Sequence, residues 1–175
     1  MTNTILIGNI VTFAGAMIMV GIGLLKTKRN ILLAQSVQCL IMGIGNLILG
    51  GMTGFLANMI TIVRNLFCLK KELTTPWKLV FITLQLAIGV PFNNMGIIGL
   101  LPIIAACIFT WFLDTKSEVF LKLLIITTMV MWLIFDCSIH NYVSTVMDVF
   151  TIISNTAGIV MLQKNAKPSA GNERL

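Results

Sequence analysis

The lysine and arginine residues of this 175-residue chain fall on alternate connections between seven apolar stretches, and this alternation limits the fold more than any other feature. The stretches cover residues 4–25, 31–49, 52–69, 77–92, 95–112, 119–135 and 142–162. A helix needs about 20 residues to cross about 30 Å of hydrocarbon, and most of the stretches approach that length. The pattern therefore predicts an all-α membrane protein with seven transmembrane helices.

The same residues predict the orientation of the chain. Basic side chains follow the odd-numbered stretches, at Lys26, Lys28, Arg29, Lys70, Lys71, Lys78, Lys116, Lys122, Lys164, Lys167 and Arg174. The connections at 50–51, 93–94 and 136–141 carry none. Because lysine and arginine collect on the cytoplasmic side, we expect the N-terminus outside and the C-terminus in the cytoplasm. Stretch 77–92 has 16 residues, yet the alternation requires it to span.

Composition excludes several classes of protein. With 57% apolar and 10% charged residues, the chain leaves no segment for a soluble domain beyond the short polar tail at 164–175, and we expect that cytoplasmic tail to be disordered. The net charge of +6 is explained by topology and contact with acidic lipid, so nucleic acid is not an expected partner. No basic segment precedes the first stretch, which therefore does not read as a cleaved signal peptide.

The chain also lacks the patterns of an enzyme or a metalloprotein. It has one histidine, no nucleophile beside a base and no glycine-rich phosphate loop, so we expect no catalytic residue, metal or cofactor. The segment 136–140 does collect an aspartate, a cysteine and a histidine. A lone histidine beside a turn is more typical of a solvated loop, and Asp136 and His140 are kept as candidates for an outer mouth.

The second half of the chain repeats the first. Residues 25–28 match 113–116 at a spacing of 88, and residues 61–65 match 151–155 at a spacing of 90. The rare polar residues align as well. The repeat predicts two three-helix units, 1–69 and 93–163, joined by a linker helix at 70–92. One linker helix leaves both units pointing the same way, with a cavity between these two parallel repeats.

Polar residues on the third and seventh stretches lie three and four positions apart, so each set occupies one helix face. The two sets are Asn58, Thr61 and Asn65, and Asp148, Thr151 and Asn155. Polar faces of this length should avoid lipid, and both would line a cavity between facing repeats as substrate-binding residues. The alternative is hydrogen bonding between helices, worth about 0.6–2 kcal/mol per contact.

Two charges inside the spans carry the most information. An aspartate at position 148 costs a few kcal/mol unless it is paired, protonated or wet. Arg64 lies in the cytoplasmic half of the third stretch and is a candidate gate or counter-charge. Its long side chain either reaches the membrane surface or pairs with Asp148.

With three helices, a linker and three helices, and with polar residues on spans three and seven, the chain resembles the SWEET, SemiSWEET and PQ-loop superfamily. Within it, the chain is most similar to YgjV-type bacterial inner-membrane proteins. The resemblance implies a bacterial inner-membrane location and facilitated movement of a small solute, with Asn58 and Asp148 at the binding positions. The chain departs from the superfamily in lacking a Pro-Gln dipeptide, and Pro102 is the only mid-helix proline in either repeat.

These observations together predict a transporter that moves a small polar or cationic solute by alternating access, with or without a proton. The alternative is a non-transporting membrane binding or assembly protein in which the polar stripes only stabilise the helix bundle. Membrane lipid is the expected surrounding in both cases. The sequence leaves the oligomeric state open, a homo-oligomer included.

Overall fold

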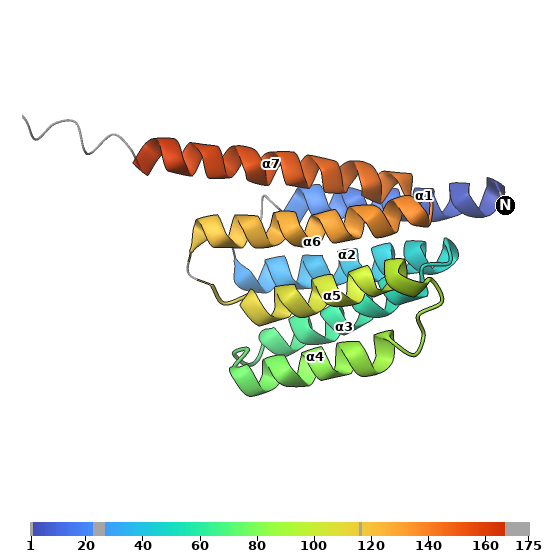
Figure 1. Ribbon diagram of the computed structural model, residues 1–175, viewed down its shortest axis with the longest axis horizontal. Coiled ribbons are helices and arrows are strands. Elements are labelled where there is room, and N and C mark those ends of the chain that lie inside the picture. The colour runs from blue at the N-terminus through green and yellow to red at the C-terminus, as the bar shows by residue number, and fades with distance from the viewer. Residues whose placement is uncertain (1, 23–26, 116, 167–175) are drawn as a thin grey trace, which may run out of the picture.

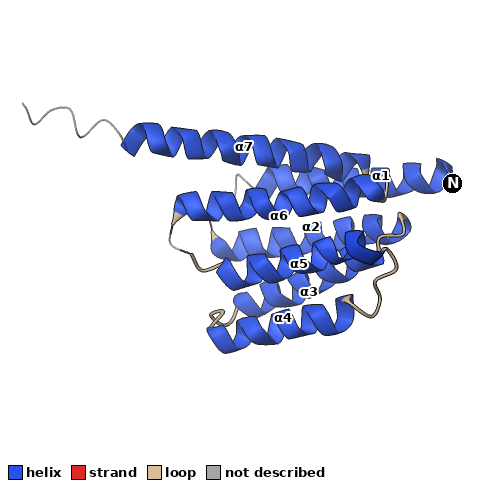
Figure 2. Cartoon of the chain, in the orientation of Figure 1, coloured by secondary structure: helices blue, strands red, loops and turns tan. Residues whose placement is uncertain are grey.

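The computed structural model describes residues 2–22, 27–115 and 117–166 and folds them into helices alone (Figures 1 and 2). The helices are α1 (Thr2–Ile22), α2 (Lys28–Ile48), α3 (Met52–Cys68), α4 (Thr75–Gly89), α5 (Gly96–Phe112), α6 (Glu118–Ser138) and α7 (Tyr142–Ala166). Successive helices run in opposite directions along one bundle (Figure 1). Each lies on one of the predicted apolar stretches, which confirms the all-α prediction for the described part of the chain.

Within the described residues, three helical segments are both long enough and apolar enough to cross a membrane: Arg29–Ile48, Glu118–Ser138 and Tyr142–Lys164. The apolar segments Asn3–Met19, Met52–Cys68 and Gly96–Phe112 are shorter. With 15 residues, α4 is about 22 Å long, which is less than the thickness of the hydrocarbon layer. The membrane character of the chain is therefore supported, whereas a total of seven spans stays a prediction.

The exposure of side chains is that of a bundle surrounded by lipid. Ile97 is 83% exposed, Met161 66% and Phe150 62%. Within the described ranges, the buried residues include more polar and charged side chains than apolar ones. Because water would make such an apolar surface unfavourable, the arrangement fits apolar side chains facing lipid and polar side chains facing the bundle interior.

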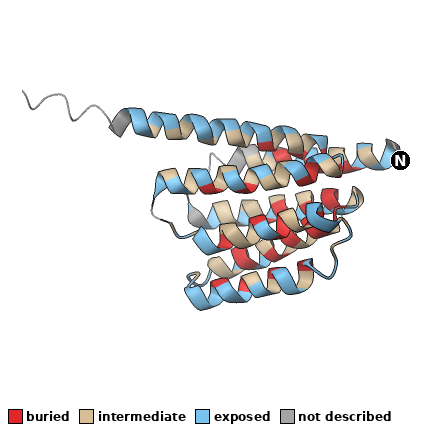
Figure 3. Cartoon of the chain, viewed as in Figure 1, coloured by how far each residue is buried: buried red, intermediate tan, exposed pale blue. Residues whose placement is uncertain are grey.

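Six of the helices form a closed ring. α1, α2 and α3 pack in that order, as do α5, α6 and α7, and the contacts of α3 with α5 and of α1 with α7 complete the circle. α4 lies outside the ring against α3 and α5 (Figure 1). After Asp148, α7 has no buried residue as far as Lys164, so its last turns contribute little to the core (Figure 3).

The turns between α2 and α3 and between α6 and α7 have the same backbone structure at a spacing of 90 residues. The N–H of Gly51 donates to the carbonyl oxygen of Asn46 at 2.7 Å, and the N–H of Asn141 donates to that of Asp136 at 2.9 Å. Both bonds close a Schellman motif at the end of a helix. α6 therefore continues through Ser138, and the loop predicted at 136–141 is shorter than expected.

The residue at the centre of each turn has a left-handed backbone. Gly50 has a φ of 87° and His140 a φ of 59°. The same spacing of 90 relates the N-caps of α2 and α6, which are Thr27 and Ser117. Thr27 thus corresponds to Ser117, and the predicted match of Thr27 with Thr115 at a spacing of 88 is wrong. The match came from a Thr-Lys pair that occurs in both connections, whereas the starts of α2 and α6 align through their N-cap residues.

Part of the predicted C-terminal tail is helical, since α7 extends through Ala166. The remainder of the tail, with Lys167 and Arg174, lies outside the described residues. The same holds for Lys26 and Lys116, two of the basic residues on which the topology prediction depends.

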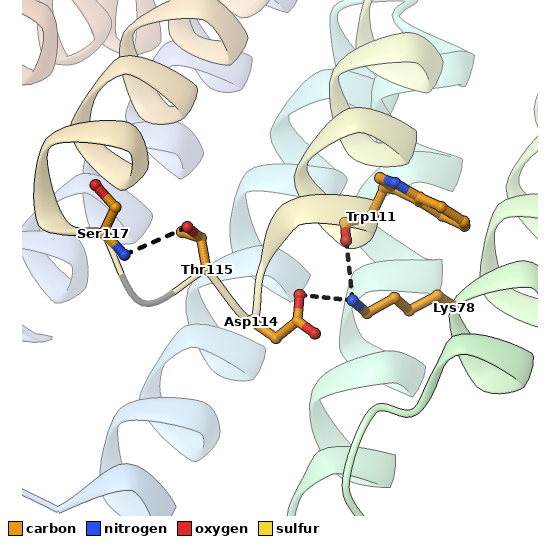
Figure 4. A network of polar contacts seen from close by, with 5 residues as sticks. All are labelled: Lys78, Trp111, Asp114, Thr115 and Ser117. Atoms are coloured by element: carbon orange, nitrogen blue, oxygen red, sulfur yellow. Dashed lines mark hydrogen bonds and ion pairs between the residues drawn. The ribbon is translucent and has the colours of Figure 1, made fainter.

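A buried lysine attaches α4 to the end of α5. Lys78 Nζ donates to Asp114 Oδ1 at 2.6 Å and to the carbonyl oxygen of Trp111 at 3.0 Å, and the N–H of Ser117 donates to Thr115 Oγ1 in the next connection (Figure 4). The hydrogen bond from the ammonium group of Lys78 lowers the pKa of Asp114 from its ordinary value. The Lys78–Asp114 ion pair therefore attaches α4, which lies outside the ring, to the end of α5.

Candidate functional site

The ring of six helices lines a cavity of about 220 Å³, and α4 contributes nothing to its lining. The polar part of the lining consists of Gln35, Gln38, Asn46, Asn58, Thr61, Arg64, Thr128, Asp136, Ser144 and Asp148. The apolar part consists of Met19, Cys39, Met42, Ala105, Ala106, Phe109, Met129 and Trp132. A space of this size and polarity holds several water molecules or one small solute.

Helix α3 presents three of the predicted residues to this cavity, namely Asn58, Thr61 and Arg64. Asn58 Nδ2 donates to the carbonyl oxygen of Gly54 and Thr61 Oγ1 to that of Ala57, both at 2.9 Å. Both bonds stay within α3, because each side chain reaches the carbonyl oxygen four residues earlier, which has a second lone pair to accept with. The carboxamide oxygen of Asn58 is therefore available to a solute.

The guanidinium group of Arg64 is buried, with 4% of the residue exposed. Nη1 donates to Thr110 Oγ1 at 2.9 Å and Nη2 to Asn65 Oδ1 at 3.2 Å, and the group lies 5.7 Å from the ring centroid of Phe109. Nε has no hydrogen-bond partner. Among the residues that the structure describes, no acidic side chain comes within ion-pairing distance, so neither Asp148 nor any other carboxylate neutralises this cation.

Hydrogen bonds around Arg64 form what we call the inner polar layer: Gln35, Arg64, Asn65 and Thr110. Asn65 Nδ2 donates to Gln35 Oε1 at 3.2 Å, which links α2 to α3, and the Arg64 bond links α3 to α5. Arg64 and Gln35 line the central cavity, whereas Asn65 lines a second cavity of about 680 Å³ beside the α3–α4 connection. The layer thus separates two spaces along the bundle.

At the other end of the cavity, hydrogen bonds form the outer polar layer, which consists of Asn9, Asn46, Asp136 and Asn141. Asn141 Nδ2 donates to Asn46 Oδ1 at 2.9 Å and to Asp136 Oδ1 at 3.4 Å. Asn9 Nδ2 donates to the carbonyl oxygen of His140 in the α6–α7 turn at 2.9 Å, and Asn9 Oδ1 accepts the N–H of Val143 in the first turn of α7 at 3.0 Å. The layer joins α1 and α2 to the other half of the ring.

Two carboxyl groups lie at this end of the cavity, that of Asp136 within the outer polar layer and that of Asp148 in the cavity lining next to it. Asp136 and Asp148 are both buried, and both line the cavity. Asp148 Oδ2 and Ser144 Oγ find no donor or acceptor among the described residues. Adjacent carboxylates repel each other in a medium of low polarity, so this pair requires a proton or a bound cation.

Four predicted residues lie elsewhere, and one of them, Asn65, lines the second cavity. Thr151 and Asn155 are half-buried outside the cavity lining, and each donates at 2.8 Å to a carbonyl oxygen one turn earlier in α7. His140 is exposed in its turn, with Nδ1 at 3.4 Å from the hydroxyl of Tyr142. The structure therefore brings together only part of the predicted set, at Asn58, Thr61, Arg64, Asp136 and Asp148.

Some functional candidates were absent from the sequence-based set. Asn141 and Ser144 lie seven and four residues before Asp148, so the same helical periodicity that grouped the α3 residues could have found them. Thr110 carries no comparable signal, because it is a single polar residue in an apolar run. Only the packing of α5 against α3 identifies it as a partner of Arg64.

Comparison with known proteins gives one match. The family model Imp-YgjV, described as a bacterial inner membrane protein, matches residues 6–166. No curated protein matches the chain. No solved structure matches it.

Proposed function

The chain belongs to the Imp-YgjV family of bacterial inner membrane proteins, and we propose that it transports a small polar or charged solute across that membrane by alternating access. The observation that carries the proposal is a cavity lined by six helices, which contains both polar and apolar side chains and has a hydrogen-bonded layer at each end. Membrane proteins seldom bury polar groups that have no hydrogen-bond partner. Among the described residues, buried atoms without a partner occur on Thr53 and Gln85 outside the cavity and on Arg64, Ser144 and Asp148 in its lining, and the latter three are available to a bound solute.

The proposal includes a SWEET-like arrangement of two parallel three-helix repeats, at 1–69 and 93–163, with α4 as the linker. It is supported by the turns that coincide at a spacing of 90 and by the position of α4 outside the ring. The N-terminus would lie outside and the C-terminus in the cytoplasm, since the starts of α2, α4 and α6 gather at one end with the C-terminal end of α7 (Figure 1).

In this mechanism Asn58 and Asp148 bind the solute and Thr61 contributes a hydroxyl. Arg64 and Asn65 close the cytoplasmic side as part of the inner polar layer, and the outer polar layer closes the other side. Opening the inner layer breaks the Asn65–Gln35 and Arg64–Thr110 hydrogen bonds, at a cost of about 2–4 kcal/mol. A difference of this size keeps the second state populated at a low but useful level. We assign no binding role to Thr151 or Asn155.

Replacement of Asp148 by asparagine separates a transporter from an assembly protein. In a transporter, D148N should reduce flux at least about tenfold while thermal stability stays near that of the wild type, because the amide has the same shape but no charge. Purified protein in liposomes would be assayed for uptake of labelled putrescine, γ-aminobutyrate and glucose. E118Q, which neutralises an exposed carboxylate at the start of α6, is the matched control.

An assembly protein would behave differently. In that case D148N would change the thermal stability, and neither the wild type nor the variant would move any of the three solutes. That outcome would contradict the proposal.

A further inference from the structure

The central cavity has opposite charges at its two ends. Arg64 lies at the inner polar layer, and the Asp136–Asp148 carboxyl pair lies beside the outer one. We propose that the solute is zwitterionic, with a carboxylate bound by Arg64 and a protonated amine bound by the carboxyl pair. This inference rests on the proposed function and specifies its substrate class.

The inner end is suited to a carboxylate. Arginine has five N–H donors in a planar fork, and the hydrogen bonds of Arg64 to Thr110 and Asn65 use two of them. Nε is buried without a partner. A carboxylate accepts two parallel hydrogen bonds from such a fork and also supplies the negative charge that the described surroundings of Arg64 lack.

The outer end is suited to an ammonium group. Asp148 Oδ2 and Ser144 Oγ are buried acceptors without a donor in the described part of the chain, and 8% of Asp148 is exposed. An ammonium group has three N–H donors and no acceptor. It would satisfy both atoms and relieve the repulsion between Asp136 and Asp148.

The two ends lie at different depths. α3 and α7 begin at the same level, because both Gly51 and Asn141 are hydrogen-bonded to Asn46. Arg64 is 13 residues after Gly51 and Asp148 is seven residues after Asn141, so their Cα atoms differ by about 9 Å in depth. A solute that contacts both ends must therefore separate its charges by several methylene groups.

The wall between the two ends is largely apolar. It includes Met42, Ala105, Ala106, Met129 and Trp132. Methylene groups would contact these side chains without leaving polar atoms unpaired, and the polar side chains of the wall, such as Asn58 and Thr61, leave room for few further hydrogen bonds. The lining thus fits a solute with a charge at each end and an apolar centre.

Binding of matched probes to the purified full-length protein tests this inference. The probes are γ-aminobutyrate, butyrate, butylamine and uncharged erythritol, measured by calorimetric titration and by the rise in unfolding temperature. We expect γ-aminobutyrate to bind at least about tenfold more tightly than the other three. We also expect glycine, whose charges are closer together, to bind more weakly than γ-aminobutyrate.

Variants assign the two ends separately. R64Q should remove the preference for γ-aminobutyrate over butylamine, and D148N should remove its preference over butyrate. R64K retains the charge but not the planar fork, so it gives a measurable loss of affinity even if R64Q fails to fold. Unchanged preferences in the folded variants would overturn the assignment of the ends.

Other outcomes overturn the inference itself. They are equal binding of butylamine, butyrate or erythritol, or no binding of γ-aminobutyrate to folded wild-type protein. Uptake into liposomes separates this inference from the proposed function. Binding of γ-aminobutyrate without uptake contradicts transport alone, whereas uptake of putrescine or glucose without γ-aminobutyrate binding supports transport and contradicts the zwitterion.

Discussion

Replacement of Asn141 tests how strongly the outer polar layer holds the two halves of the ring together. The side chain is fully buried, and its amide nitrogen donates to Asn46 and Asp136. Its Oδ1 accepts the N–H of Ser144 at 3.3 Å, which is the N-cap interaction of α7. Asn141→Ala removes all of these bonds at once.

The expected loss of stability has two parts. Loss of an N-cap side chain costs about 1 kcal/mol. Loss of the donor leaves Asn46 Oδ1 buried without a partner, which costs about 1–3 kcal/mol, with the lower half of that range favoured because hydrogen bonds between membrane helices average about 0.6 kcal/mol. We therefore expect N141A to lower the free energy of unfolding by about 2–3 kcal/mol.

Asn141→Ser separates the two parts, because serine caps a helix but cannot reach across to Asn46 as the amide does. It should recover about 1 kcal/mol of the loss. Unfolding of the purified protein would be followed by circular dichroism during heating and in increasing denaturant, with the exposed Asn94→Ala as the control. A loss below about 0.5 kcal/mol for N141A, or an equal loss for the serine and alanine variants, would refute the reasoning.

Two glycines give further predictions for the same measurement. A Cβ at Gly54 would lie 2.5 Å from Phe135 Cε1, so G54A should destabilise the fold by about 1–3 kcal/mol, and F135L in the same chain should recover part of that loss. A Cβ at Gly50 would meet nothing within 4 Å, so G50A should cost about 1 kcal/mol through its positive φ alone. His140→Gly relieves the same strain in the other repeat and should not destabilise; a clear loss there would contradict the equivalence of the two turns.

The fold was largely predictable because hydropathy and charge act on each helix separately. Apolar runs located every described helix, and the match of residues 61–65 with 151–155 revealed the spacing of 90 that the two turns share. In the first connection Thr27 was aligned with Thr115, because the two residues are identical by chance. The N-cap that corresponds to Thr27 is Ser117. Capping depends on backbone geometry, which a short identical pair does not reveal.

The site was predictable where helical periodicity alone decides the exposed face. Asn58 and Asp148 reach the cavity for that reason. Periodicity does not say how far two helices stay in contact, and so it could not exclude Thr151 and Asn155. The partners of Arg64 depend on which helices are neighbours in the ring, and no local pattern in the sequence carries that information.

Labelling of the cavity from each side of the membrane tests the central claim most directly. Asn58→Cys and Asp148→Cys would be made in a chain whose native cysteines at 39, 68, 107 and 137 are replaced, and treated with a charged thiol reagent that cannot cross the membrane. Alternating access predicts that both positions react from the periplasmic side and from the cytoplasmic side. A stable protein in which neither position reacts from either side would contradict it, and would identify the polar interior as a dry core that only holds the helices together.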